Sequence, residues 1–135
     1  MFAAAKDAFR RWEPFELGWA RVANPEARIA IGEFVAVEVI SLGLWSLNIS
    51  RIVDIVDTPE RFGFVYATTE RHVELGEELF LLRFDGVTGE VRYKLEAASR
   101  PRFWMARLGY PATRMLQHRF ARDSHRRMRE VTDSV

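Results

Sequence analysis

Hydrophobic and polar residues alternate through the middle of the chain, and this pattern predicts a run of β-strands. Alternating side chains point to opposite faces of a sheet, so Phe34 and Ile40 are predicted on one face and Val35 and Val37 on the other. Short connections containing Gly, Pro or Asp separate the segments, which favours an antiparallel meander. The alternating segments span residues 33–41, 45–56, 61–69, 77–84 and 90–98.

Both ends of the chain have a helical pattern instead. FAAAKDAFRRW (2–12) is rich in alanine and places Phe2, Phe9 and Trp12 near one face of a helix. At SRP (99–101) the alternation typical of a strand is predicted to end, and residues 102–108 favour a helix. A second, long helix is predicted from Pro111 to about Val131, with proline in its first turn.

These elements predict an α+β fold in which a curved antiparallel sheet of about five to six strands packs on the long C-terminal helix. A sheet must bury one apolar face, and the C-terminal helix is the only predicted element large enough to cover it. This is the helix-grip arrangement, which can hold a ligand in a cavity between sheet and helix. The abundant aromatic residues, Trp45 and Trp104 among them, are expected to lie mostly in the core.

The composition is that of an ordinary globular protein, with 48% hydrophobic and 29% charged residues over 135 positions. We expect a single domain over residues 1–135. The absence of cysteine excludes disulfides and thiolate chemistry, and any metal would need His and carboxylate ligands. We predict no cofactor and no metal. No segment has the pattern of a membrane span or a signal peptide, so a cytoplasmic location is expected.

Charge is distributed unevenly although the net charge is only +1. From Arg100 onward nine arginines face three acidic residues, while the preceding part of the chain is acidic. Such a basic segment can bind nucleic acid or an anionic membrane, and it can also pack against an acidic sheet. We do not expect nucleic-acid binding, because the basic residues are mixed with an apolar stripe and no stacking aromatics accompany them.

The segment GFVYATTERHVELGEELF (63–80) carries the densest cluster of candidate chemistry. In an extended chain His72 and Glu74 point the same way, and Glu78 shares that face. A histidine beside carboxylates can act as a general acid or base, so these three are the candidate catalytic residues. The same stretch can equally be a solvated hairpin whose paired glutamates, Glu77 and Glu78, discourage association of strand edges.

This segment, together with NISRIV (48–53), SRP (99–101) and PATRMLQ (111–117), resembles the bacterial and plant "domain of unknown function 1990" family. The resemblance extends over nearly the whole chain, although Ala67 stands where the family usually has glycine. It implies a helix-grip fold of the START-like, birch-allergen-like superfamily and no established function. The family usually has a short strand before the first helix, and its absence here would expose a sheet edge.

Three functions follow as hypotheses. The first is a domain that binds an apolar or amphipathic small molecule, with a polar edge at Arg51, Tyr66, Thr68, His72 and Glu77, joined by Glu74 and Glu78. The second is an enzyme that uses His72 with a neighbouring glutamate. The third is an interaction module that forms a homodimer through an exposed sheet edge. Arg51 is either an anion clamp or, as we favour, the structural partner of Glu77 or Glu78.

Overall fold

The computed structural model describes residues 1–41, 43–68, 74–101 and 110–133, with the side chains of 41, 68, 74–75, 97–101 and 110–114 excepted. Its strands form one six-stranded antiparallel sheet in the order of the sequence, which confirms the predicted curved antiparallel meander and the α+β class. The elements in chain order are helix α1 (Phe2–Arg10), the 3-10 turn η1 (Glu13–Phe15), β1 (Ala20–Val22), β2 (Phe34–Ser41), β3 (Leu44–Asp57), β4 (Arg61–Thr68), β5 (Glu74–Phe84), β6 (Val91–Pro101) and helix α3 (Tyr110–Asp133).

Two strands differ from the prediction. Strand β1 was not predicted, because three residues are too few to show a period; it forms by pairing with Val37–Val39 of β2. Strand β6 continues through Pro101, although a change of period was predicted at residues 99–101. Pairing with β5 as far as Glu74 extends the strand beyond the alternating segment. The helix predicted at 102–108 lies outside the described residues.

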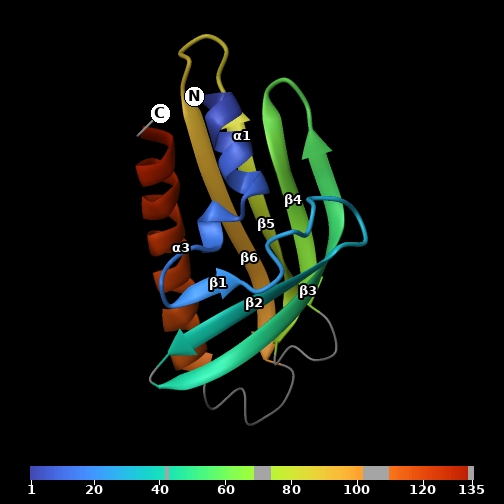
Figure 1. The fold of residues 1–135 in the computed structure, drawn as a ribbon, viewed down its shortest axis with the longest axis vertical. Helices are drawn as coiled ribbons and strands as arrows, with labels where there is room; N and C mark the ends of the chain where they lie inside the picture. Colours follow the sequence, from blue (N-terminus) through green and yellow to red (C-terminus); the bar gives the residue numbers. More distant parts are fainter. Residues whose placement is uncertain (42, 69–73, 102–109, 134–135) are drawn as a thin grey trace.

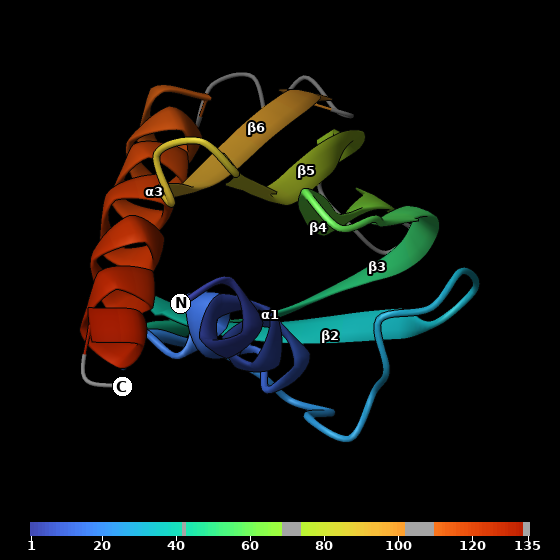
Figure 2. The same ribbon diagram turned by 90° about the horizontal axis from the view of Figure 1, so that it is seen from above.

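The sheet curves so strongly that its two ends face each other. Strands β4, β5 and β6 form one layer, and β2 crosses in front of them (Figure 1). Helix α1 lies beside the β1–β2 segment in that front layer, and α3 runs along one side of the molecule (Figure 2). We call the face of the sheet that is turned toward these helices concave and the opposite face convex. Two helices therefore cover the concave face, whereas the sequence predicted only the C-terminal one.

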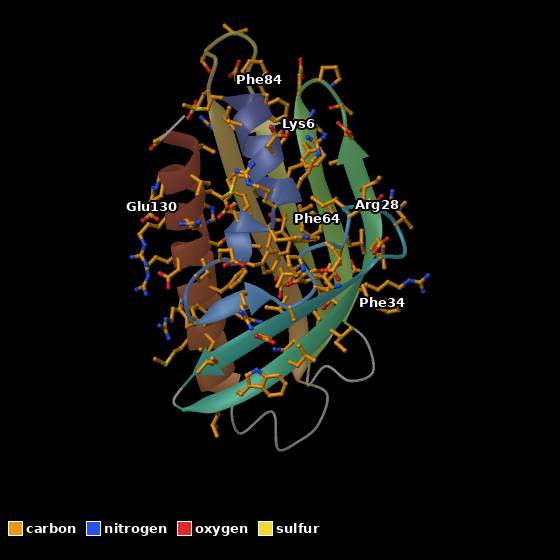
Figure 3. The ribbon with its side chains drawn as sticks, in the orientation of Figure 1. Lys6, Arg28, Phe34, Phe64, Phe84 and Glu130 are labelled. Atoms are coloured by element: carbon orange, nitrogen blue, oxygen red, sulfur yellow. The ribbon has the colours of Figure 1, made fainter. Side chains whose placement is uncertain are left out.

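Aromatic side chains fill the space against the concave face. Phe64, labelled at the centre of Figure 3, stacks on Phe80 with ring centroids 4.9 Å apart. Phe15 of η1 lies 5.0 Å from Phe80 and 5.3 Å from Phe120 of α3. Trp12 adopts a left-handed backbone conformation between α1 and η1 and donates its indole N–H to the carbonyl of Ala27 at 2.9 Å. This turn directs Phe15 into the core.

Polar contacts fasten α3 to the N-terminal segment. The indole of Trp19 donates to the Asp123 carboxylate at 2.9 Å, and Arg127 donates to Glu13 at 2.6 Å. Along this helix Met128 is buried, whereas the side chain of Met115 is exposed. No helix within the described residues is long and apolar enough to cross a membrane.

The environment of each strand residue follows from the face it occupies. Val35, Val37 and Ile52 are buried on the concave face, while Trp45 is largely exposed on the convex face. Trp45 is thus an exception to the expectation that most aromatic residues lie in the core, because no helix of the described residues covers the convex face of the β2–β3 hairpin. Glycine is required at 63, where a Cβ would collide with the carbonyl oxygen of Phe80.

Candidate functional site

The most distinctive polar group on the concave face is a tyrosine–carboxylate pair. Tyr66 of β4 and Glu78 of β5 are cross-strand partners, and the phenolic hydroxyl donates to Glu78 Oε2 at 3.0 Å. Tyr66 is only 7% exposed. Burial raises the pKa of Tyr66 well above its usual value of 10.0, and the nearby Glu78 charge and hydrogen bond raise it further. Tyr66 is therefore a neutral hydrogen-bond donor and not a base at physiological pH.

A second polar group, the hydroxyl of Ser50, lies on the same face of the sheet. Ser50 precedes Ile52 by two residues in β3, and Ile52 is the cross-strand partner of Tyr66, so Ser50 and Tyr66 are diagonal neighbours. Ser50 is 3% exposed, and its hydroxyl has no hydrogen-bond partner in the described part of the chain. Buried hydroxyls are normally paired, so this one needs an explanation.

Helix α3 contributes a third polar residue to this end of the molecule. Gln117 is half-buried and lies about one helical turn before Phe120, whose ring packs on the aromatic core. Helix α3 begins at the end of the sheet where β4 finishes (Figure 1). We call Ser50, Tyr66, Glu78 and Gln117 the polar end of the core. The ring of Tyr66 packs against Phe15 and Phe80, so polar and aromatic groups meet at this residue.

The sequence predicted a single polar edge. In the structure, its residues lie on both faces of the sheet. Tyr66 and Glu78 share the concave face, as the alternation of β4 and β5 requires. Arg51 and Glu77 are exposed on the convex face, because each is one residue out of phase with Ser50 or Glu78. His72 lies outside the described residues, as do the side chains of Thr68 and Glu74.

The predicted ion pair between Arg51 and Glu77 or Glu78 is wrong. Glu78 points to the other face, and Glu77 is separated from Arg51 by the intervening strand at Ala67. Neighbouring strands are about 4.8 Å apart, so two strand spacings place the backbones roughly 10 Å from one another. The guanidinium of Arg51 instead lies 5.9 Å from the ring centroid of Phe34. Among the described residues, Arg51 makes no ion pair with either glutamate.

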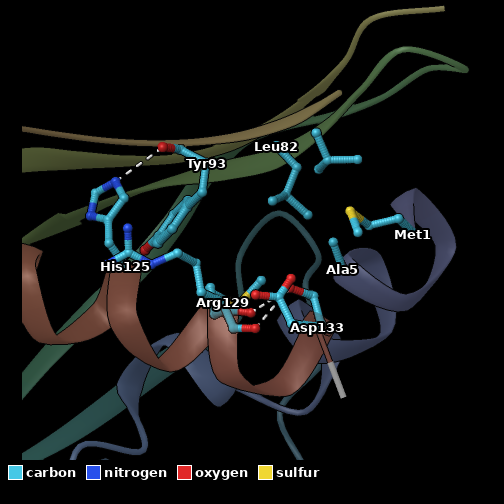
Figure 4. A pocket seen from close by; sticks show the side chains of 10 residues that line it. Met1, Ala5, Leu82, Tyr93, His125, Arg129 and Asp133 are labelled. Carbon is cyan, nitrogen blue, oxygen red and sulfur yellow. Dashed lines mark hydrogen bonds between the residues drawn. The ribbon is translucent and has the colours of Figure 1, made fainter. Parts of the chain in front are cut away.

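Sequence reasoning missed a cleft at the opposite end of the core. Its volume is about 220 Å³, and it opens between the start of α1, the last turns of α3 and strands β5 and β6 (Figure 4). The ring of His125 lies at one side, with Nδ1 2.6 Å from the Ala121 carbonyl and Nε2 3.0 Å from the Tyr93 carbonyl. These contacts hold α3 against β6. Tyr93 also bonds to buried Ser124 at 2.8 Å.

Ser50 and His125 were not among the predicted site residues. The alternation of β3 places Ser50 beside Ile52, but it does not show which face the helices cover. The helical spacing from Phe120 through Ser124 indicates the buried face of α3, and His125 borders it. No group of three or more His, Asp or Glu side chains that could hold a metal ion occurs among the described residues.

Comparison with known proteins identifies the family. The family model described as "Domain of unknown function (DUF1990)" matches residues 1–127, so the chain belongs to this family. A UPF0548 protein of Dictyostelium discoideum is 34% identical over 98% of this chain and 67% of its own length. A UPF0548 protein of Arabidopsis thaliana is 30% identical over 91% of this chain and 62% of its own length.

A UPF0548 protein of Deinococcus radiodurans is 40% identical over 59% of this chain and 40% of its own length. The chain therefore spans about two thirds or less of the length of these relatives. No solved structure matches the chain. The membership predicted from the segment at 63–80 is confirmed, and the family carries no assigned activity.

Proposed function

We propose that this member of the DUF1990 family binds a small amphipathic molecule at the polar end of the core, between the sheet and α3. The observation that carries the proposal is the buried Ser50 hydroxyl, which has no partner among the described residues and lies diagonal to Tyr66. A ligand that bonds to this hydroxyl would remove the cost of leaving it unpaired. The proposal includes the helix-grip assignment, in which a ligand is held between sheet and helix.

The polar end favours a ligand head group that donates a hydrogen bond. Glu78 accepts a hydrogen bond from Tyr66, and an ionised carboxylate can accept hydrogen bonds but cannot donate them. Ser50 can both donate and accept. Arg51, the cation predicted to clamp an anion, lies on the other face and cannot serve here. A neutral or cationic head group with a hydroxyl or amine therefore fits better than a carboxylate or phosphate.

The apolar part of the ligand would contact the aromatic rings next to Tyr66. Phe80 and Phe15 lie 5.2 and 6.2 Å from Tyr66 between ring centroids. Small-molecule sites usually combine such apolar walls with a few polar groups that fix orientation. Thr68, His72 and Glu74 remain predicted contacts outside the described set. The proposal is limited to binding, because the catalytic hypothesis depends on His72.

Native mass spectrometry of the purified protein, compared with denaturing mass spectrometry of the same sample, tests this proposal. The wild type is expected to retain a non-covalent adduct that denaturation releases. Glu78→Gln replaces the acceptor on the concave face, and Glu77→Gln makes the same chemical change at the next residue on the convex face. We expect the dissociation constant of the adduct to be at least tenfold higher in Glu78→Gln, which corresponds to about 1.4 kcal/mol, and unchanged in Glu77→Gln.

Circular dichroism and thermal unfolding of both variants show whether the fold is retained. Equal loss of the adduct in Glu77→Gln and Glu78→Gln would place the ligand elsewhere. Mass spectra without an adduct, followed by no change in melting temperature with any compound of a metabolite library, would contradict the proposal altogether.

A further inference from the structure

The convex face of the β2–β3 hairpin carries a cluster of exposed large apolar side chains. Phe34 and Ile40 of β2 are each 54% exposed, and Trp45 and Leu47 of β3 are 61% and 38% exposed. Their cross-strand register places all four on the same side of the hairpin. We call these four residues the outer hairpin face. Figure 3 shows Phe34 at one end of this face, projecting away from the core.

The arrangement of this face is that of an interface. Single exposed apolar residues are common, but a contiguous group of them usually marks a binding surface. Arg51 lies against Phe34 at one end of the group. Glu38 lies within it, between Phe34 and Ile40 along β2 and opposite Leu47, and Arg21 donates to its carboxylate at 2.7 Å. Apolar side chains together with paired charges suit a protein–protein interface, which as a whole is about as apolar as the rest of a protein surface.

We infer that the outer hairpin face binds a second copy of this chain. Large apolar side chains present roughly 150–250 Å² each, so the exposed fractions of these four correspond to about 400 Å² per copy. Two copies would bury about 800 Å² from these residues alone, and bordering residues would bring the total toward the lower limit of specific interfaces, about 1,200 Å². This area predicts a weak dimer that forms with rising concentration.

The two ends of the face are complementary to each other. The row Phe34–Arg51 forms one end and the row Ile40–Trp45 the other. A two-fold axis that lies in the plane of the face, across its middle and at a right angle to the strands, brings two copies face to face. It places the Phe34–Arg51 row of one copy on the Ile40–Trp45 row of the other. The guanidinium of Arg51, which has no ion pair in the described residues, would then lie against the indole of Trp45, a favourable cation–π contact.

The face is a better candidate than the β1 edge of the sheet, although the sequence suggested pairing through an edge. Strand β1, the edge strand, is only 3 residues long and pairs with β2 at Val37–Val39. Asn24 bonds to the preceding part of β2: its side chain donates to the Phe34 carbonyl at 2.8 Å and accepts from the Ala36 N–H at 2.9 Å. Few backbone groups of β2 are therefore available to another strand.

Sedimentation velocity from about 2 to 500 μM tests the inference, because this range brackets the weak association that the buried area predicts. The weight-average mass of the wild type is expected to rise from 15.7 kDa toward twice that value. Trp45→Ser and Leu47→Ser should each raise the dimer dissociation constant at least about tenfold. Arg51→Ala should raise it about threefold through loss of the cation–π contact.

Leu44→Ser is the matched control. Leu44 is the sequence neighbour of Trp45 and is 74% exposed, but it points to the opposite side of the hairpin. Its substitution should change the dissociation constant less than about twofold, which is the error expected for an uninvolved surface site. A wild type that stays monomeric throughout, a mass that grows beyond the dimer, or equal effects of Leu44→Ser and Trp45→Ser would each overturn the inference.

Discussion

The concave and convex faces of the sheet carry similar apolar side chains but differ in what covers them. Phe64 and Phe80 are buried on the concave face under α1, η1 and α3, whereas Phe34 and Trp45 are exposed on the convex face of the hairpin. Hydrophobicity alone does not decide burial, because the pleat of a strand sends adjacent residues to opposite environments. The helices decide which face becomes the core.

The largest expected effect comes from truncating one aromatic residue on each face. Phe64→Ala should lower the free energy of unfolding by about 3–5 kcal/mol, because it leaves a cavity beside Phe80 and Phe9. Trp45→Ala removes a larger side chain but should cost less than about 1 kcal/mol in the monomer. Urea denaturation at a low protein concentration measures both values.

Keeping the concentration low separates folding from association through the outer hairpin face. Comparable losses in the two variants would mean that the convex face is covered in the folded monomer. The division of the sheet into a covered and an uncovered face would then be wrong.

The strand pattern in the sequence was sufficient to predict β2 to β6 but not their orientation. The segment at 45–56 alternates with Trp45 and Leu47 on one side and Ser50 and Ile52 on the other. The first set is more apolar, yet Ile52 of the second set is buried and Trp45 of the first set is exposed. An irregularity between Ile52 and Asp54 then shifts the phase of the second half of β3.

The candidate site was predictable in part for the same reason. The segment at 63–80 drew attention to both Tyr66 and Glu78, but their pairing is known only from the register between β4 and β5. It could not assign Arg51, which depends on the register between β3 and β4 across a different turn. Ser50 gave no signal of its own, since a serine in a strand is ordinary until its burial is known.

The next largest effect is a pH dependence of stability that arises from Tyr66, which is buried on the concave face. Its pKa is raised in the folded state, first by burial and then by Glu78, so the unfolded chain loses this proton at lower pH. The stability contributed by Tyr66 is fully present below about pH 10 and is lost as the pH rises further. Above pH 10 the wild type should lose about 1.4 kcal/mol per pH unit more than Tyr66→Phe.

Urea denaturation of the wild type and Tyr66→Phe at several pH values between 9 and 11.5 tests this pH dependence; the upper limit is set about 1.5 units above the ordinary tyrosine pKa. Absorbance at an ultraviolet wavelength specific for tyrosinate reports ionisation in the same samples. Parallel pH profiles for the two proteins would show that Tyr66 ionises equally in the folded and unfolded states. The description of Tyr66 as a buried neutral donor would then fail.

The smallest expected effect has the opposite sign and bears most directly on function. Ser50→Ala removes a buried hydroxyl without a described partner, so it should raise the free energy of unfolding of the ligand-free protein by about 1 kcal/mol. Ser46→Ala, at an exposed position in the same strand, should change it by less than about 0.5 kcal/mol. Chemical denaturation after removal of bound small molecules gives both values.

A site kept for binding should lose function where it gains stability. Ser50→Ala is therefore expected to be more stable than the wild type and to retain less of the adduct seen by native mass spectrometry. If Ser50→Ala is instead destabilised, the hydroxyl already has a partner in the ligand-free protein. Its burial would then be a structural feature of β3, and the polar end of the core would lose the observation that favours a ligand.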